Sequence, residues 1–281
     1  MASQADKEVF IERTDGGRLF MRSWHPVGNP RAIIMICHGI NSHSGQYFWV
    51  ANRLACEGYA VYALDLRGRG NSSGERYFVE TIDQYVEDLA AAISHAKTQE
   101  PELSIFLLGH SAGGIVSCIY VLDNQHEING FICESFAFQI SASTLVLSLI
   151  KGLSLIAPHL PVLRLKNADF SRDPAAVHAM NKDPLIANEM QPSQTIAALI
   201  RAGDRLRKEF QRITLPVLIL HGTADKATLP SGSQRFYDTV GSPDKALWLY
   251  QDRAHDLLND LGKEKILDDI SDWIDSRIPE H

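Results

Sequence analysis

The sequence predicts an α/β fold, in which a mostly parallel sheet carries helices on both faces and a helical insertion interrupts the second half. Continuously apolar segments of strand length alternate with helix-length segments, which is the pattern of parallel strands covered on both sides. A chain of 281 residues with 45% hydrophobic and 22% charged residues is large enough for a substantial core. In this fold class, function is expected at the carboxyl ends of the strands.

The first predicted element is a hairpin, formed by residues 8–13 and 18–24 around the turn Asp15-Gly16-Gly17. Further strands are expected at 31–37, 60–64, 105–108, 130–133, 216–220 and 246–250, because each is a short apolar run. Helical periodicity is found at 46–57, 81–98, 112–124 and 261–278.

The alternation of strands and helices is broken between residues 136 and 210. We therefore predict a core in two parts, residues 1–135 and 211–281, joined by an insertion at 136–210 that we call the cap.

Within the cap, residues 140–157 predict an amphipathic helix with polar residues at spacings of three and four. The segment is too polar, and too interrupted by Gly152 and Pro158, to span a membrane. Its apolar residues, Leu149 and Leu153 among them, would belong either to a lid that lines an acyl pocket or touches a membrane surface, or to a core-packed helix. We favour the lid.

Charge and cysteine usage exclude several classes of protein. The net charge of −7 and pI near 5.9, without basic stretches that carry aromatic residues, argue against nucleic-acid binding. The basic run at 201–212 is expected to be a solvated helix face, because Asp204 and Glu209 interleave with it.

Residues 1–8 lack the features of a signal peptide, which favours a cytoplasmic protein. The four cysteines stand singly in apolar segments, so we expect buried free thiols at Cys37, Cys56, Cys118 and Cys133.

The motif of greatest interest is G-x-S-x-G at residues 109–113, which lies between an apolar strand and a helix. This context exposes the serine, Ser111, as a nucleophile on a sharp turn that small residues permit. A second copy at 70–74 has no strand before it and no helix after it, so we expect a loop there and do not assign Ser72 as the nucleophile. The G-x-G-x-x-x-G spacing of that loop also differs from the dinucleotide fingerprint.

A base and an acid are expected at the ends of two later strands. Asp225 follows the strand at 216–220 and His255 follows the strand at 246–250, which gives the order Ser, Asp, His of an α/β-hydrolase triad. Asp252 and Asp256 are too close to His255 in sequence to sit across from its Nδ1 easily. His110 and His221 are expected to support the backbone.

The oxyanion site is predicted from the loop that begins at His38-Gly39-Ile40. The backbone N–H groups of Ile40 and Ala112 are the expected donors, because one N–H follows the nucleophile and the other comes from this earlier strand end.

Several motifs together resemble the monoacylglycerol lipase and lysophospholipase branch of the α/β hydrolases, in the serine aminopeptidase S33 or hydrolase 4 group. The resemblance covers nearly the whole chain. It rests on H-G-x-x-x-H-S-G-x-Y at 38–47, D-x-R-G-x-G-x-S-x-G at 65–74, G-H-S-x-G-G at 109–114, S-R-D-P at 171–174, Asp183-Pro184-Leu185, H-G-x-x-D at 221–225 and the segment from His255 to Asn259.

The resemblance implies an α/β-hydrolase fold with a helical cap and a serine hydrolase that cleaves carboxylic esters of fatty acids through an acyl-enzyme on Ser111. It also implies that the substrate is a small-molecule lipid or ester and that the reaction needs no metal or cofactor. The same triad also serves C–C hydrolases, acyltransferases and cofactor-free haloperoxidases, and a ligand receptor with a hydrolase fold is a further alternative. No oligomeric state is predicted.

Departures from the family pattern concern the substrate. Ala112 stands where the family usually has Met, Arg69 where it has His, and Asp256 where it has Glu. Monoglyceride-cleaving members tend to carry Glu and Arg at the positions of Ser42 and Gln46, where they resemble contacts to the glycerol head. The expected substrate contacts are Gly39, Ser42, Gln46, Leu149 and Leu153, and the head group stays open.

Overall fold

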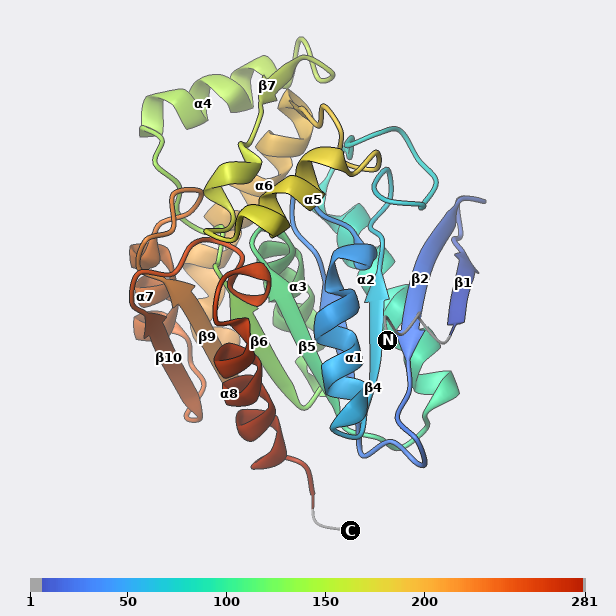
Figure 1. The fold of residues 1–281 in the computed structure, drawn as a ribbon. Coiled ribbons are helices and arrows are strands. Elements are labelled where there is room, and N and C mark those ends of the chain that lie inside the picture. The colour runs from blue at the N-terminus through green and yellow to red at the C-terminus, as the bar shows by residue number, and fades with distance from the viewer. Residues whose placement is uncertain (1–6, 280–281) are drawn as a thin grey trace.

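The computed structural model describes residues 7–279 and confirms the predicted α/β architecture (Figure 1). In this part of the chain, eight strands form one sheet in the order β1-β2-β4-β3-β5-β6-β9-β10. The pairs β1–β2 and β2–β4 are antiparallel, and the remaining pairs are parallel. The carboxyl ends of the parallel strands therefore meet at one edge of the sheet, which faces the cap (Figure 1).

The strands agree with the sequence prediction to within about two residues at each end. Strands β3, β4, β5, β6 and β9 are buried along their whole length, which explains their continuously apolar sequences. The bounds of the sheet strands are β1 Lys7–Glu12, β2 Arg18–Trp24, β3 Ala32–Cys37, β4 Tyr59–Leu64, β5 Ile105–His110, β6 Gly130–Glu134, β9 Val217–Gly222 and β10 Lys245–Tyr250.

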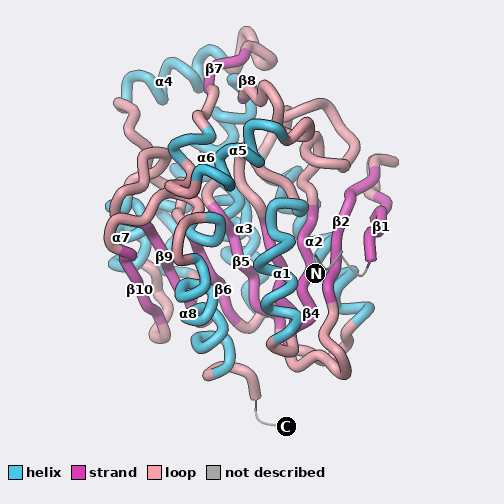
Figure 2. The backbone as a smooth tube through the Cα atoms, in the orientation of Figure 1, coloured by secondary structure: helices cyan, strands magenta, loops and turns pink. Residues whose placement is uncertain are grey.

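Helices cover both faces of the sheet, as Figure 2 shows. Helices α1 (Phe48–Cys56) and α8 (Lys263–Asp275) contribute buried residues to the hydrophobic cluster on one face. Helices α2 (Ile82–Gln99), α3 (Ala112–Asn124) and α7 (Pro230–Thr239) pack on the other face. Helix α7 was not predicted. Phe236 is its one fully buried aromatic or aliphatic side chain, so the segment shows almost no apolar periodicity.

The cap residues lie over the carboxyl edge of the sheet (Figure 1). They form the helices α4 (Thr144–Leu153), α5 (Pro174–Lys182) and α6 (Ser193–Glu209), with a small antiparallel pair of β7 (Pro161–Leu163) and β8 (Gln191–Pro192). Helix α6 differs from the other two, because its residues Ile196, Ala202 and Leu206 belong to the main hydrophobic core.

Helix α4 is shorter than predicted and is not a core helix. It begins at Thr144, where Ser143 Oγ accepts a hydrogen bond from the Val146 N–H, and it ends at Leu153. No residue of α4 is buried, and the side chains of Leu145 and Leu149 are 69% and 62% exposed. The alternative of a core-packed helix is therefore wrong, and the outer face of α4 is apolar.

Other expectations can be compared directly with the structure. Cys37, Cys118 and Cys133 are buried free thiols, but Cys56 is exposed, because α1 buries Val50, Ala51 and Leu54 and ends at Cys56 on its outer side. Arg205 pairs with Asp123 and Glu209, in keeping with a solvated basic helix face. No helix between residues 7 and 279 combines the length and the apolarity needed to cross a bilayer. Residues 1–6 of the segment inspected for a signal peptide lie outside the described residues.

Candidate active site

The turn between β5 and α3 holds Ser111 in a strained backbone conformation, with φ 55° and ψ −119°. Two glycines make this turn possible. A Cβ atom on Gly113 would lie 2.2 Å from the Cys37 carbonyl oxygen, and one on Gly109 would lie 2.6 Å from Ser117 Oγ. The G-x-S-x-G spacing is thus a steric requirement of the local chain path, and it lifts the Ser111 side chain above the sheet edge.

Ser111, His255 and Asp225 are brought together from three separate strand ends. The Ser111 hydroxyl lies 2.9 Å from His255 Nε2, and His255 Nδ1 lies 2.7 Å from Asp225 Oδ2. All three side chains are buried, with Ser111 only 5% exposed. This geometry allows the imidazole to take the serine proton while the carboxylate fixes its tautomer and orientation.

The carboxylate of Asp225 is held by a dense set of donors. The backbone N–H groups of Ala227 and Thr228 donate to Oδ1, at 2.8 and 2.9 Å, and the Thr228 hydroxyl donates to Oδ2 at 2.8 Å. Burial alone would raise the pKa of Asp225, but hydrogen bonds from His221, His255 and Thr228 outweigh it and hold that pKa well below its usual range. Asp225 is therefore ionised at neutral pH and can stabilise a positive charge on His255.

His221 has a different place from the one expected. Its Nε2 lies 3.0 Å from Asp225 Oδ2, and its Nδ1 lies 2.7 Å from Ser233 Oγ. The sequence predicted that His221 supports the backbone rather than takes the serine proton. His255 is the imidazole on Ser111, but the His221 ring contacts the side chains of Asp225 and Ser233 instead of supporting the backbone. The signal was present in the H-G-x-x-D spacing, since a turn of this length returns Asp225 to the end of β9. Thr228 carried no comparable signal in the sequence.

The second copy of the motif is a structural loop, as predicted. The Ser72 hydroxyl accepts a hydrogen bond from the Phe20 N–H at 2.8 Å and donates one to the Asp65 carbonyl. Both interactions tie the loop to the sheet, and no imidazole in the described residues contacts this hydroxyl.

The loop after β3 approaches Ser111 closely. A Cβ atom on Gly39 would lie 2.9 Å from Ser111 Cβ, so only glycine allows this approach. The His38 ring fixes the loop, because Nδ1 lies 2.8 Å from the Gly39 carbonyl and Nε2 accepts from the Leu66 N–H at 3.1 Å. Burial lowers the pKa of His38 to about 4, which keeps this ring neutral.

The two expected oxyanion donors face the same cavity as Ser111. Ile40 and Ala112 both line it, and within residues 7–279 neither backbone N–H donates a hydrogen bond to another group. The next N–H, that of Asn41, donates to Glu189 at 3.0 Å and so fixes the direction of the loop. Unpaired N–H groups beside a nucleophile are suited to hold an oxyanion.

Behind the triad lies a buried cluster of His110, Glu134 and Asp256, which the sequence did not indicate. Their ligand atoms all lie within 4.8 Å of one another, a separation at which such groups can hold a cation. Burial and the nearby Asp256 charge raise the pKa of Glu134 well above its usual range, whereas burial and the charge of His255 lower the pKa of His110. Both groups are therefore held in their neutral forms.

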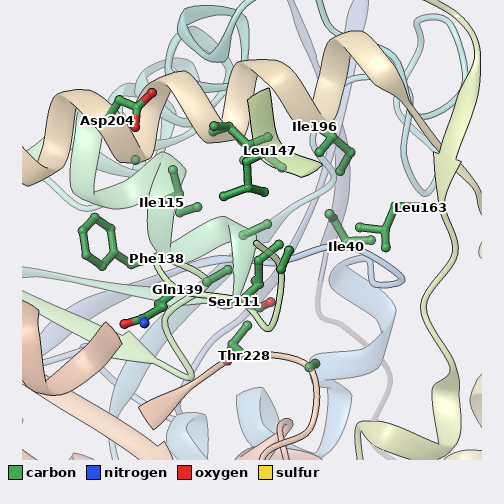
Figure 3. Close-up of a pocket in the computed structure, with 18 of the residues that line it drawn as sticks. Ile40, Ser111, Ile115, Phe138, Gln139, Leu147, Leu163, Ile196, Asp204 and Thr228 are labelled. Atoms are coloured by element: carbon green, nitrogen blue, oxygen red, sulfur yellow. The ribbon is translucent and has the colours of Figure 1, made fainter. Parts of the chain in front are cut away.

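The cavity above Ser111 has a volume of about 300 Å³ and is mainly lined by apolar side chains. Figure 3 shows Leu147 from α4 and Ile196 from α6 on the opposite side of the cavity from Ser111 and Thr228. Phe138, Ile115 and Leu163 continue this wall, and Asp204, Arg207 and Arg235 are the charged members of the lining. The cavity has the character expected of an acyl-chain site.

The predicted substrate contacts do not line this cavity. Ser42 is 4% exposed, and Gln46 donates to the Asn41 carbonyl at 3.5 Å, while Gly39 lines a small adjoining space of about 10 Å³. Leu149 points away to the exposed face of α4, and Leu153 is also absent from the described lining. The residue of α4 that faces the cavity is Leu147, which is two positions from Leu149 and therefore on another side of the helix.

Comparisons with known proteins identify one matching family and several similar lipases. Residues 28–262 match the family described as serine aminopeptidase, S33. A monoacylglycerol lipase of Mycolicibacterium smegmatis is 31% identical over 280 residues, which cover 99% of this chain and 100% of the relative. A monoglyceride lipase of Rattus norvegicus is 33% identical, with 95% and 90% of the two chains covered. The crystal structure of a Paleococcus ferrophilus monoacylglycerol lipase has a TM-score of 0.83 and 28% identity, over 92% of this chain and 99% of that chain.

Proposed function

The chain belongs to the serine aminopeptidase S33 family of α/β hydrolases, and from this premise we propose that it hydrolyses monoesters of fatty acids with Ser111 as the nucleophile. It is a carboxylic ester hydrolase, and its substrate is a small lipid or ester. The observation that carries the proposal is the 2.9 Å contact between Ser111 and His255 at the base of an apolar cavity.

In the proposed reaction, His255 Nε2 takes the proton of the Ser111 hydroxyl as Oγ attacks the ester carbonyl carbon. The N–H groups of Ile40 and Ala112 hold the negative charge that develops on the carbonyl oxygen. His255 then gives its proton to the leaving alcohol when the ester C–O bond breaks. A water molecule, deprotonated by the same imidazole, releases the fatty acid from Ser111. Asp225 stays ionised throughout and stabilises the imidazolium.

The substrate class is supported by the relatives and by the lining of the cavity. Matching family members are named monoacylglycerol or monoglyceride lipases, and their substrates carry one acyl chain and a polar alcohol. An apolar cavity that ends at Ser111 is suited to one such chain.

We also propose that residues 136–210 form a cap that acts as a lid over the core, which consists of residues 1–135 and 211–281. Support comes from α4, which is exposed on its outer face and contributes Leu147 to the cavity on its inner face. Its exposed residues Leu145 and Leu149, with Leu155 and Ile156 after the helix, form an apolar surface suited to a transient contact with a lipid aggregate or a membrane.

The test compares Ser111→Ala with Ser72→Ala, using 1-oleoylglycerol and p-nitrophenyl butyrate as substrates. We expect Ser111→Ala to lose about a millionfold in kcat on both esters and to lose the mass adduct formed with a fluorophosphonate. Ser72→Ala should keep the adduct and most of the turnover, because the Ser72 hydroxyl bonds to backbone groups alone among residues 7–279. Full activity in Ser111→Ala would refute the assignment of the nucleophile.

A further inference from the structure

A second cavity, of about 540 Å³, lies beside the loop that carries Ile40. It is bounded by Asn41 from the core and by two segments of the cap, residues 164–168 and 181–189. Leu165 lines both this cavity and the apolar cavity above Ser111. Ile40 and Asn41 are consecutive in the chain, and Ile40 lines the apolar cavity while Asn41 lines the second cavity. We call this space the polar cavity, because seven of the ten residues that line it are polar or charged.

Three asparagine side chains form a chain of hydrogen bonds along the polar cavity. Asn41 Nδ2 donates to Asn167 Oδ1 at 3.0 Å, and Asn167 Nδ2 donates to Asn181 Oδ1 at 3.0 Å. Asn41 is only 4% exposed, yet its Oδ1 accepts no hydrogen bond from the described residues. A buried acceptor without a partner is costly unless a ligand or water supplies a donor, so this end of the chain is suited to a hydroxyl group.

The charges around the polar cavity favour an anion. Arg164 and Lys166 are exposed, and neither has an ion pair or a side-chain hydrogen bond within residues 7–279. The one carboxylate in the lining, Glu189, is 3% exposed and is engaged by Arg69, by the Asn41 N–H and by Gln191. Because Arg69 neutralises this carboxylate, Arg164 and Lys166 are left as the uncompensated charges.

We infer that the polar cavity binds the head group of the leaving alcohol and that it favours a glycerol head esterified to phosphate over a neutral glycerol. This inference rests on the proposed function and specifies its substrate class. The Asn41 acceptor would take a glycerol hydroxyl, and Arg164 and Lys166 would pair with the phosphate. The reaction breaks only the carboxylic ester C–O bond. Water supplies a hydroxyl to the fatty acid and a proton to the alcohol, and the phosphate ester is unchanged.

Inhibition of p-nitrophenyl butyrate hydrolysis tests the site without a lipid surface. We expect sn-glycerol 3-phosphate to inhibit competitively at concentrations about tenfold lower than inorganic phosphate or glycerol. Arg164→Gln/Lys166→Gln should raise its inhibition constant about tenfold and leave kcat/KM for the butyrate ester unchanged. The control Lys208→Gln/Arg212→Gln removes the same charge from the exposed surface at and just beyond the end of α6, and it should change neither value. Equal inhibition by inorganic phosphate would indicate a general anion site and overturn the inference, as would an unchanged inhibition constant in the first double variant.

A second measurement uses 1-oleoylglycerol 3-phosphate and 1-oleoylglycerol in nonionic detergent micelles of one composition. We expect a higher kcat/KM for the phosphate ester, with a loss of about tenfold for that ester alone in Arg164→Gln/Lys166→Gln. Hydrolysis of 1-oleoylglycerol at an equal or higher rate, unaffected by the double variant, would overturn this inference and leave the proposed function intact. Hydrolysis of p-nitrophenyl butyrate without hydrolysis of either lipid would overturn both.

Discussion

The core and the cap place their apolar residues in opposite ways. In the core, five parallel strands are buried throughout, and the residues that follow them form a tightly bonded site around Ser111. In the cap, α4 has no buried residue, α5 buries only Met180, and several leucines face outward. Helix α6 is the exception, since it packs into the main core.

This difference separates the chemistry from the choice of substrate. The core fixes reacting atoms within hydrogen-bond distance, which requires close packing on all sides. The cap contributes walls to two cavities, and its helices α4 and α5 bury few of their own residues. We therefore expect core substitutions to affect every ester equally, and cap substitutions to affect esters according to their chain or head group.

The largest expected effect is that of Asp225→Asn in the core. An amide would favour the wrong tautomer of His255 and would not stabilise its positive charge, so kcat should fall by about 10⁴-fold. The loss should be the same for acetate, octanoate and oleate esters, as measured by initial rates at saturating substrate. A loss that varied strongly with chain length would contradict the division of roles between core and cap.

Glu134→Gln should change how the stability of the core depends on pH. The folded protein keeps the Glu134 proton to higher pH than the unfolded chain does, because burial and Asp256 raise its pKa. Above the ordinary pKa of 4.5, Glu134 therefore binds fewer protons in the unfolded chain than in the folded protein. The free energy of unfolding falls as the pH rises for this reason. Glu134→Gln removes this contribution, at most about 1.4 kcal/mol per pH unit.

Urea unfolding at several pH values between 5 and 8 measures this effect. The variant should lose less stability than the parent protein as the pH rises. Parallel curves for the two proteins would show that Glu134 is ionised in the folded state.

Glu189→Gln tests the junction between cap and core. Arg69 is almost completely buried, and its partner Glu189 also accepts the Asn41 N–H. Loss of the carboxylate leaves a buried guanidinium without its counter-charge, which should lower the free energy of unfolding by about 3 kcal/mol. Asp123→Asn is the control, because it breaks an exposed ion pair with Arg205 and should cost less than about 1 kcal/mol. Equal losses of unfolding free energy in the two variants, measured with urea, would show that the buried Arg69–Glu189 pair stabilises the fold no more than the exposed pair does.

The smallest expected effect, and the most selective, is that of Leu147→Asp in the cap. A carboxylate in the apolar cavity should lower kcat/KM for oleate esters by about tenfold to a hundredfold, with little effect on acetate esters. Leu149→Asp is the matched control on the exposed face of the same helix. It should not affect soluble esters, although it should weaken binding to lipid vesicles in a sedimentation assay. Equal losses for both variants on soluble esters would contradict the orientation of α4.

Much of the core could be predicted from the sequence because local pattern and tertiary role coincide there. The apolar run at 105–108, followed by two glycines around Ser111, is interpretable without any knowledge of distant residues. The order of Asp225 and His255 after their strands could be predicted in the same way, since parallel strands place their carboxyl ends together.

The remaining features depend on partners that are distant in sequence. Leu147 and Leu149 have the same side chain, and only the packing of α4 on α6 determines which of them faces the cavity. The cluster of His110, Glu134 and Asp256 joins three strand ends, so no short motif could indicate it. Only the resemblance to the family pointed to Ser42 and Gln46 as substrate contacts. The structure buries the first and directs the second toward its own loop.

The adjacency of Ile40 and Asn41 has a consequence for how this enzyme can be altered by selection. One short loop borders both cavities, and its direction is fixed by the bond from the Asn41 N–H to Glu189. Mutations in that loop should therefore change the acceptance of acyl chains and of alcohols together, and many should reduce turnover. Libraries that aim at a new alcohol should instead vary Arg164 and Lys166, which line the polar cavity and not the apolar one.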